Sequence, residues 1–212
     1  MISGITLLTT ALLLALPSPA TPPPDAAALI ARLARPAPSS TEYVEVRFVH
    51  MLRKPLVLHG GLDYGGAGKL GKRVERPYRE TTTIADGSVN VQREGRPPRQ
   101  FPLDRAPELQ ALLAGFSALL GGNAAALEKY YTISLVENAA NWTLTLTPRD
   151  AALSRHLREI VVDGAGGEPS CFSLHEADGD ASIMLLGALA ASSLGDAPTL
   201  PALDRICLRV LP

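Results

Sequence analysis

One glycine-rich segment has the spacing of a phosphate-binding loop. Gly66, Gly71 and Lys72 fit the pattern G-x-x-x-x-G-K, in which backbone N–H groups and the lysine bind the phosphates of a nucleotide. The pattern needs Ser or Thr directly after the lysine to hold magnesium, and this sequence has Arg73 there. The flanking segments alternate like strands, whereas a phosphate loop joins a strand to a helix. We therefore interpret the segment as a hairpin loop.

Side chains suited to catalysis or metal binding are scattered along the chain. His59-Gly60-Gly61 is similar to the oxyanion turn of some lipases, but no G-x-S-x-G nucleophile sequence follows it, so we expect a β-bulge there. The four histidines show no spacing typical of a zinc site. Asp178 and Asp180 are of the type that binds calcium, but a hairpin turn explains both better. We therefore predict no catalytic residue, no metal site, no cofactor and no enzymatic activity.

The chain has two cysteines, Cys171 and Cys207, and both lie in segments that we interpret as strands. In an oxidising compartment such a pair favours a disulfide. Two buried thiols are the alternative, because a disulfide needs Cα atoms within about 7 Å of each other and the sequence does not fix that distance.

Residues 1–20 have the character of a secretory signal peptide. Residues 5–16 form a largely apolar run, and the small residues Ser18 and Ala20 stand at the positions that a signal peptidase reads. A run of about a dozen residues is too short to span roughly 30 Å of hydrocarbon. We expect cleavage near Ala20 and a mature protein in the periplasm. No cysteine directly follows the apolar run, so we expect no lipid attached to the mature N-terminus.

The composition argues against nucleic acid as a partner. The chain has 20 Lys and Arg against 21 Asp and Glu, so its formal net charge is −1, whereas nucleic-acid-binding domains are basic. Basic residues concentrate in residues 69–105 and acidic residues in residues 148–212. We favour a solvated surface as the explanation over a docking patch for an anionic partner. The length that remains after the signal peptide suits one hydrophobic core.

Hydrophobic periodicity predicts a short helix followed by strands. After a Pro-rich leader, Asp25 can cap a helix that Pro36 ends. From Thr41 the apolar residues recur at every second position, which is the period of half-buried strands. We predict strands at residues 43–49, 56–64, 70–75, 78–85, 88–93 and 99–103, with a hairpin turn at Asp86-Gly87.

A second helical segment interrupts the strands. Leucines and Phe116 recur at spacings of three and four between Pro107 and Gly121-Gly122, and a shorter helix is expected at residues 124–129. Strands then resume at residues 130–137, 141–147, 157–163, 169–177 and 181–189, with a last strand at 205–211 after a loop at 190–201. The expected fold class is mainly β with α. One large curved antiparallel sheet would bury the apolar faces of the helices.

Several short signatures stand in a fixed order along these elements. They are Tyr43 to Val49, Gly61-Leu62-Asp63-Tyr64, Arg76-Pro77, Ile84-Ala85-Asp86-Gly87, Trp142 to Pro148, Leu157-Arg158-Glu159-Ile160 and Glu176 to Asp180. Their order and spacing resemble the LolA family, the periplasmic carriers that ferry lipid-modified proteins to the outer membrane. The chain looks most like a divergent branch found with fatty-acid or aryl-polyene synthesis functions. The resemblance therefore supports acyl binding in general more strongly than lipoprotein carriage.

The resemblance implies an unclosed β-barrel with a helical lid, at about residues 107–129, over an apolar cavity. Arg76 matches an Arg-Pro step that places an arginine at the lid in the carriers, while Lys72 and Arg73 are close enough to compete for that role. The apolar residues that we expect to line the cavity and bind the ligand are Phe48, Leu58, Leu62, Ile84, Leu109, Leu112, Leu113, Phe116, Leu119, Trp142 and Leu144.

Two functions of different kinds are consistent with these features. The first is a non-catalytic periplasmic carrier that binds acyl chains or lipid-modified cargo and passes it toward the outer membrane. Each buried methylene contributes roughly 0.8 kcal/mol, so such cargo can be held without covalent chemistry. The second is a periplasmic sensor or scaffold that contacts a membrane-protein partner, with the apolar interior as ordinary core.

The expected organisation is a signal peptide at residues 1–20, a leader with the first helix at 21–40, and one LolA-like domain at 41–212. We expect this domain to be a monomer. As a carrier it would meet an inner-membrane donor and an outer-membrane acceptor protein.

Overall fold

A computed structural model describes residues 25–195 and 197–208 of the chain, so the predicted signal peptide lies outside the described residues. The described strands are β1 (Ser39–Phe48), β2 (Leu56–Tyr64), β3 (Leu70–Arg76), β4 (Glu80–Ala85), β5 (Ser88–Arg93), β6 (Arg99–Pro102), β7 (Tyr131–Glu137), β8 (Trp142–Pro148), β9 (Leu157–Ala165), β10 (Glu168–Glu176) and β11 (Ala181–Leu186). They form one antiparallel sheet in the order β6-β5-β4-β3-β2-β1-β11-β10-β9-β8-β7. The sheet is not closed, because β6 and β7 stand at opposite ends of this order.

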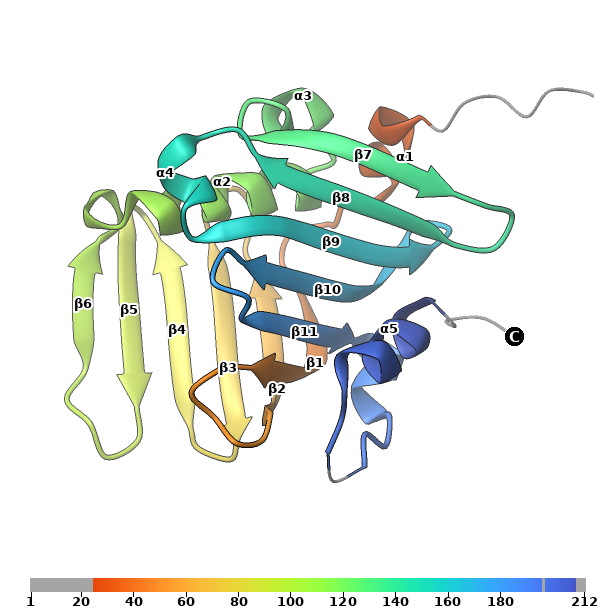
Figure 1. Cartoon of the computed structure of the whole chain (residues 1–212). Coiled ribbons are helices and arrows are strands. Elements are labelled where there is room, and N and C mark those ends of the chain that lie inside the picture. The colour runs from red at the N-terminus through yellow and green to blue at the C-terminus, as the bar shows by residue number, and fades with distance from the viewer. Residues whose placement is uncertain (1–24, 196, 209–212) are drawn as a thin grey trace, which may run out of the picture.

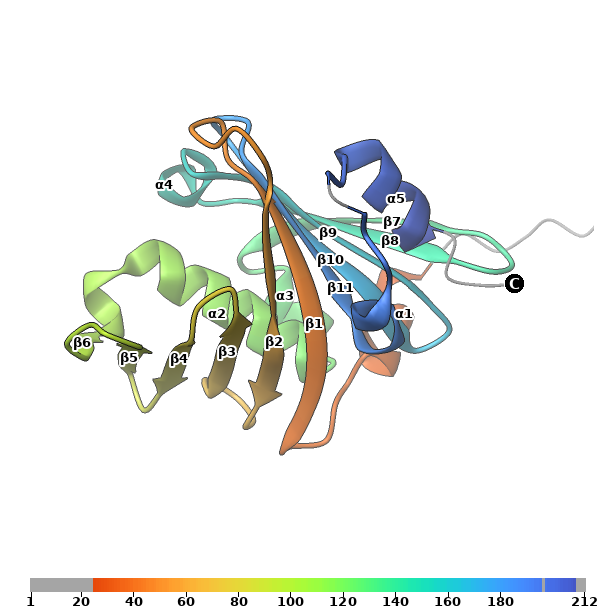
Figure 2. The ribbon, with the colours of Figure 1, turned by 90° about the horizontal axis from the view of Figure 1, so that it is seen from below.

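The described helices are α1 (Ala26–Arg32), α2 (Pro107–Leu120), α3 (Ala124–Leu127), α4 (Ala151–Ser154) and α5 (Leu200–Leu208), with 3-10 turns η1 (Leu103–Arg105) and η2 (Gly187–Ala191). Strands β2 to β6 form one arm of the sheet and β7 to β11 the other, with β1 between them (Figure 1). Figure 2 shows α2 in the angle between the two arms, with α5 on the opposite face of the sheet. Within the described residues, no helix is both long and apolar enough to cross a membrane.

A bulge lies between β2 and β3 at His59 and Gly60. The register shifts there as the two glycines predicted, but the extra residue is in β3: His59 pairs with Arg76 and Gly60 with Val74, so Glu75 has no partner in β2. Gly60 also lies close to the neighbouring backbone. A Cβ atom at this position would stand 1.8 Å from the carbonyl oxygen of Arg73, so only glycine fits without a shift of β3.

The predicted helix ends are found near the expected residues. Asp25 caps α1, because its carboxylate accepts a hydrogen bond from the backbone N–H of Ala28 at 3.1 Å. Helix α2 begins at Pro107 and ends at Leu120, Gly121 is its C-cap, and Gly122 has a left-handed φ of +67° that breaks the helix. The strands before it were also predicted at nearly their observed positions.

The last predicted element is wrong, because residues 200–208 form helix α5 and not the start of a strand. Its apolar residues recur at helical spacing: Leu203 and Cys207 are four apart and both are buried against the sheet. The sequence predicted a strand at residues 205–211 from the alternation of apolar residues there, and a loop at residues 190–201. Residues 209–212, which complete the predicted strand, lie outside the described residues.

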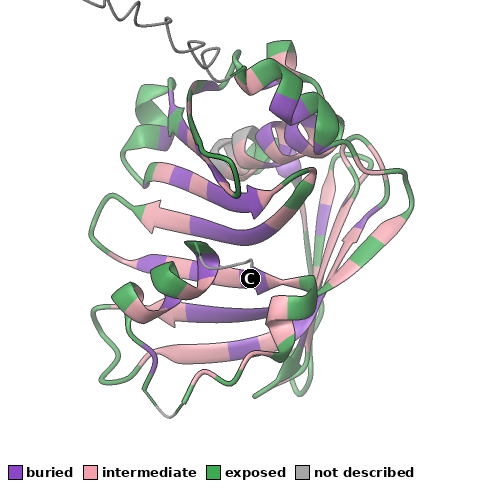
Figure 3. Ribbon diagram, turned by 90° about the vertical axis from the view of Figure 1, so that its right-hand side faces the viewer, coloured by how far each residue is buried: buried purple, intermediate pink, exposed green. Residues whose placement is uncertain are grey.

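The sheet is covered on both faces, and each face has its own core. On the outer face, Val44, Val46 and Ile183 pack with the two cysteines and Leu203 of α5. On the inner face, the largest cluster joins α1, α3 and the second half of α2 to strands β7 to β10. Buried residues concentrate in the middle of the strands, and exposed residues lie in the connecting loops (Figure 3).

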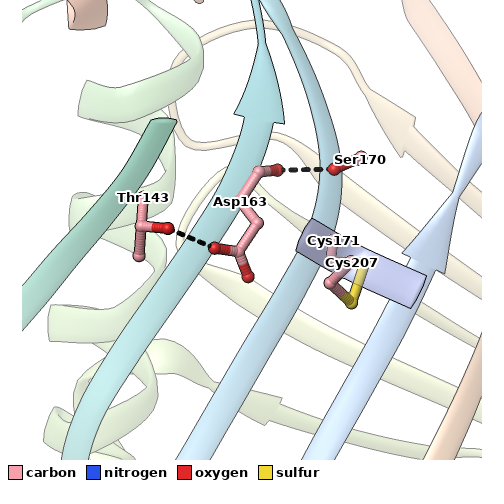
Figure 4. The surroundings of a disulfide bond; sticks show 5 residues. All are labelled: Thr143, Asp163, Ser170, Cys171 and Cys207. Atoms are coloured by element: carbon pink, nitrogen blue, oxygen red, sulfur yellow. Dashed lines mark hydrogen bonds between the residues drawn. A yellow bond between two sulfur atoms is a disulfide. The ribbon is translucent and has the colours of Figure 1, made fainter. Parts of the chain in front are cut away.

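A disulfide ties α5 to the outer face of the sheet. Cys207 of α5 is bonded to Cys171 of β10, with the two Cα atoms 5.5 Å apart (Figure 4). Beside it, the Asp163 carboxylate accepts a hydrogen bond from Thr143 at 2.7 Å, and the Asp163 carbonyl accepts one from Ser170 at 2.9 Å. Burial raises the pKa of the Asp163 carboxyl despite the hydrogen bond from Thr143.

Candidate functional site

A cavity of about 730 Å³ lies between the inner face of the sheet and helix α2. This volume is within the range of roughly 300–1,000 Å³ that small-molecule sites occupy. Six apolar side chains of α2 line it: Leu109, Leu112, Leu113, Phe116, Leu119 and Leu120. The apolar residues that line it from the strands include Phe48, Leu62, Leu70, Val74, Ile84, Val162, Phe172, Leu174, Ala181, Met184 and Leu186, and Val49 directly after β1 also lines it.

Helix α2 closes the cavity because it packs on both arms of the sheet. Toward β4 and β5, Leu109 and Leu113 belong to a cluster with Ile84 and Val89. Toward β10, the ring of Phe116 meets the ring of Phe172 with 4.5 Å between centroids. The helix therefore joins two parts of the sheet that are far apart in the sequence.

The close packing of α2 on β7 depends on Gly115. A Cβ atom at Gly115 would lie 2.4 Å from Cε2 of Tyr131, so the helix reaches this distance only without a side chain there. Tyr131 is fully buried, and no hydrogen-bond partner for its hydroxyl is found among the described residues. Burial raises the pKa of this hydroxyl to about 12.

The structure brings together eight of the eleven apolar residues that were expected at the cavity. The eight that line it are Phe48, Leu62, Ile84, Leu109, Leu112, Leu113, Phe116 and Leu119. Leu58, Trp142 and Leu144 are not among the lining residues that the structure describes. Leu58 is buried against Tyr43 and Val74, and the other two are buried in the cluster beneath α1 and α3. Whether the eight residues bind a ligand stays a prediction.

Arg76 lies away from the helix that it was expected to contact. Arg76 is exposed and is the last residue of β3. The first residue of β3, Leu70, is the one that packs with the cluster of Leu109 and Leu113 of α2. Among the described residues, those that line the cavity include Lys72 and not Arg76. Lys72, which was considered as an alternative to Arg76, is therefore the basic side chain of β3 that lines the cavity.

A charged cluster occupies the inner face of the sheet within this cavity. Glu45 of β1 is only 2% exposed, and its carboxylate accepts hydrogen bonds from Arg47 Nε at 2.8 Å and from Ser182 Oγ at 2.6 Å. The other carboxylate oxygen of Glu45 lies 2.5 Å from Lys72 Nζ. Lys72 reaches it across the ring of Tyr43, whose centroid is 5.3 Å from Nζ. Glu45, Arg47, Lys72 and Ser182 all line the cavity.

Burial and neighbouring charges shift the pKa values of this cluster in opposite senses. Burial would raise the pKa of the Glu45 carboxyl, but the charges and hydrogen bonds of Lys72 and Arg47 outweigh it and lower that pKa. Burial lowers the pKa of the Lys72 ammonium, and Glu45 offsets only part of this effect. Two cations thus share one carboxylate in a largely apolar cavity.

Sequence reasoning missed this cluster because β1 is covered on both faces. The alternation of apolar residues from Thr41 was interpreted as a half-buried strand, with the polar side chains in solvent. In the structure Val44 and Val46 pack under α5, and Glu45 and Arg47 line the cavity. One feature of the sequence could have indicated this: Leu200, Leu203 and Cys207 recur at helical spacing, and an amphipathic helix there has to pack its apolar side on the sheet.

One group of potential metal ligands lies at the turn between β10 and β11. Within the described residues, His50, Asp178 and Asp180 have ligand atoms within 4.8 Å of one another. Asp180 accepts a hydrogen bond from the backbone N–H of His50 at 2.9 Å and lies 2.8 Å from His50 Nδ1. These hydrogen bonds lower the pKa of Asp180 and raise that of His50. Local hydrogen bonding explains the group, and we assign no metal to it.

Three solved structures similar to this chain share 10–15% sequence identity with it. A LolA superfamily protein from Nitrosomonas europaea is 10% identical, with 80% of this chain and 93% of that chain covered and a TM-score of 0.42. The MucA/MucB complex from Pseudomonas aeruginosa gives 15% identity and a TM-score of 0.42, with 85% of this chain and 60% of that chain covered. LprF from Mycobacterium bovis gives 12% identity and a TM-score of 0.36, with 82% and 97% covered.

A sequence search of curated proteins finds no match. Comparison with family models gives a specific result. The model described as "Outer membrane lipoprotein carrier protein LolA-like" matches residues 19–210, which is most of the chain. The unclosed antiparallel sheet with a helix against its inner face agrees with this assignment. The chain therefore belongs to the family of LolA-like outer membrane lipoprotein carrier proteins.

Proposed function

We propose that this protein is a non-catalytic periplasmic carrier that binds the acyl chain of a lipid or of lipid-modified cargo in its cavity. The observation that carries the proposal is the apolar cavity of about 730 Å³ under α2. An ordinary protein interior is packed with few voids larger than a water molecule. A cavity of this size with leucine and phenylalanine walls suits an apolar guest.

The family description supports carriage, since it names outer membrane lipoprotein carriers. The proposed route takes cargo from an inner-membrane donor to an outer-membrane acceptor. Helix α2 would act as the lid, because Gly121-Gly122 follows it and η1 precedes it, so it can move as one unit. Release would then require a partner that opens α2 or competes for the acyl chain.

A chain-length series tests binding in the cavity. Saturated fatty acids of increasing length should displace a fluorescent fatty acid from the purified protein. At roughly 0.8 kcal/mol per buried methylene, two added carbons should tighten the Kd by about tenfold until the cavity is full. An affinity that does not change with chain length, or no displacement at any length, would contradict the proposal. The second result would favour a sensor or scaffold whose interior does not take a ligand.

A further inference from the structure

The cavity has a largely apolar end under α2, where the charged residues Arg35 and Glu168 pair with each other at 2.7 Å, and a second charged end away from α2. Three paired residues mark the end of the strands nearest α2: Ser39 of β1 pairs with Tyr64 of β2, and Tyr64 pairs with Leu70 of β3. Leu70 packs against the cluster that contains Leu109 and Leu113 of α2. Arg47 lies further along β1, and the step from residue 39 to residue 47 spans roughly 25 Å at about 3.3 Å per residue. Both Ser39 and Arg47 line the cavity, so it extends along this distance.

The charged end has hydrogen-bond donors that the protein does not use. Arg47 gives Nε to Glu45, and within the described residues no acceptor is found for its two terminal nitrogens. Lys72 gives one hydrogen bond to Glu45, and an ammonium group has three donors. Two cations in contact with one carboxylate leave one positive charge in excess.

The other charged groups at this end do not cancel that excess through direct contact. Glu80 lies 3.9 Å from Arg93, and Asp180 is hydrogen-bonded to His50. Glu176 also lines the cavity: burial together with Asp178 and Asp180 raises the pKa of its carboxyl, and the charge of Arg47 lowers it. Among the described residues, no ion pair joins Glu176 to Arg47 or Lys72.

We propose that the cavity holds a single-headed anionic amphiphile in one orientation, with its carboxylate on Arg47 and Lys72 and its acyl tail under α2. This inference rests on the proposed function, and it adds a ligand class and a direction of binding. The guanidinium of Arg47 presents a planar pair of N–H groups that matches a carboxylate. The apolar walls formed by Leu109, Leu112 and Phe116 lie at the tail end.

The test compares a fatty acid with its methyl ester, which has the same chain and no charge. Wild-type protein should bind the acid at least about tenfold more tightly than the ester. Arg47→Gln should remove most of this preference and leave ester binding within about twofold of wild type. Arg47 is partly exposed and Lys72 still pairs with Glu45 in this variant, so the fold should be retained. Arg53→Gln makes the same charge change at an exposed position and should leave the preference unchanged.

The direction of binding has its own readout in the single tryptophan of the chain. Trp142 is buried in the same cluster as Leu119, with Phe116 packed against that cluster, at the α2 end. A fatty acid brominated at its terminal carbon should quench Trp142 fluorescence more than one brominated beside the carboxylate. The reverse order would overturn the orientation.

The outcomes separate this inference from the proposed function. Equal wild-type affinity for acid and ester, or an acid preference that persists in Arg47→Gln, would overturn the head-group site while carriage of acyl chains stands. In that case the cluster of Glu45, Arg47 and Lys72 is a structural link between β1 and β3. Binding of neither ligand by wild-type protein would overturn both proposals.

Discussion

Gly115 of α2 rests on the ring of Tyr131, at a distance where even a methyl group would not fit. Alanine stabilises a helix interior by about 1 kcal/mol relative to glycine, whereas overpacking a core costs about 1–3 kcal/mol. We therefore expect Gly115→Ala to lower the free energy of unfolding by about 1 kcal/mol, measured by urea titration. In a Tyr131→Ala background the same change should be stabilising. Equal destabilisation in both backgrounds would show that the contact does not set the position of α2.

Aspartate in place of a lid residue should abolish ligand binding and leave the protein folded. Leu112 and Phe116 line a cavity and are only partly buried, so the introduced carboxylate can keep water around it. Leu112→Asp and Phe116→Asp should lose fluorescent fatty-acid binding, with little change in far-ultraviolet circular dichroism. If these residues were ordinary core, an unpaired buried charge would cost several kcal/mol and unfold the protein.

The matched control for these variants lies outside the cavity. Val136 of β7 is 68% exposed, so Val136→Asp introduces the same charge without reaching the ligand. It should bind fatty acid like the wild type. A folded Leu112→Asp protein with wild-type affinity would contradict the assignment of α2 as the lid.

The Glu45 carboxylate should make the free energy of unfolding depend on pH in the acidic range. Its pKa in the folded protein is below its ordinary value, so its contribution is present at pH values above about 4.5 and is lost as the pH falls through the folded pKa. Glu45→Gln leaves Lys72 and Arg47 without their counter-charge and should cost about 3 kcal/mol at pH 7. This difference from wild type should shrink as the pH is lowered toward 3, measured by urea unfolding at each pH. Glu94→Gln, at an exposed loop position, should show no such difference.

The disulfide should stabilise the protein by fixing α5 on the sheet. Its two cysteines are separated by 36 positions, and closing a loop of that size contributes about 2–4 kcal/mol. Cys171→Ser/Cys207→Ser should lower the free energy of unfolding by this amount. Protein denatured without reductant should show no free thiol, and labelling of both cysteines under those conditions would contradict the pairing.

Much of the fold follows from local patterns in the sequence. Asp86 and Gly87 both have positive φ, at 50° and 72°, which is what the Asp-Gly signal for a tight hairpin requires. The alternating segments became strands, and the leucine-rich segment after Pro107 became α2. These features could be predicted because turn chemistry and periodicity act over a few residues.

The charged end of the cavity could not be predicted in the same way, because it depends on which face of β1 the rest of the chain covers. Alternation along residues 43–48 fixes two faces but does not say which one is inward. Helix α5 decides this by covering Val44 and Val46, and it comes from the distant segment that was mistaken for a strand. That error and the missed cluster therefore have one cause.

Mass spectrometry of lipid extracted from the folded, purified protein tests whether the cavity under α2 carries acyl chains. We expect an amphiphile with an acyl chain, recovered in near-stoichiometric amount from wild type and lost from Leu112→Asp. The Val136→Asp control should retain it. An extract without any such molecule, from protein that also fails to bind added fatty acids, would contradict the claim that the cavity under α2 carries acyl chains.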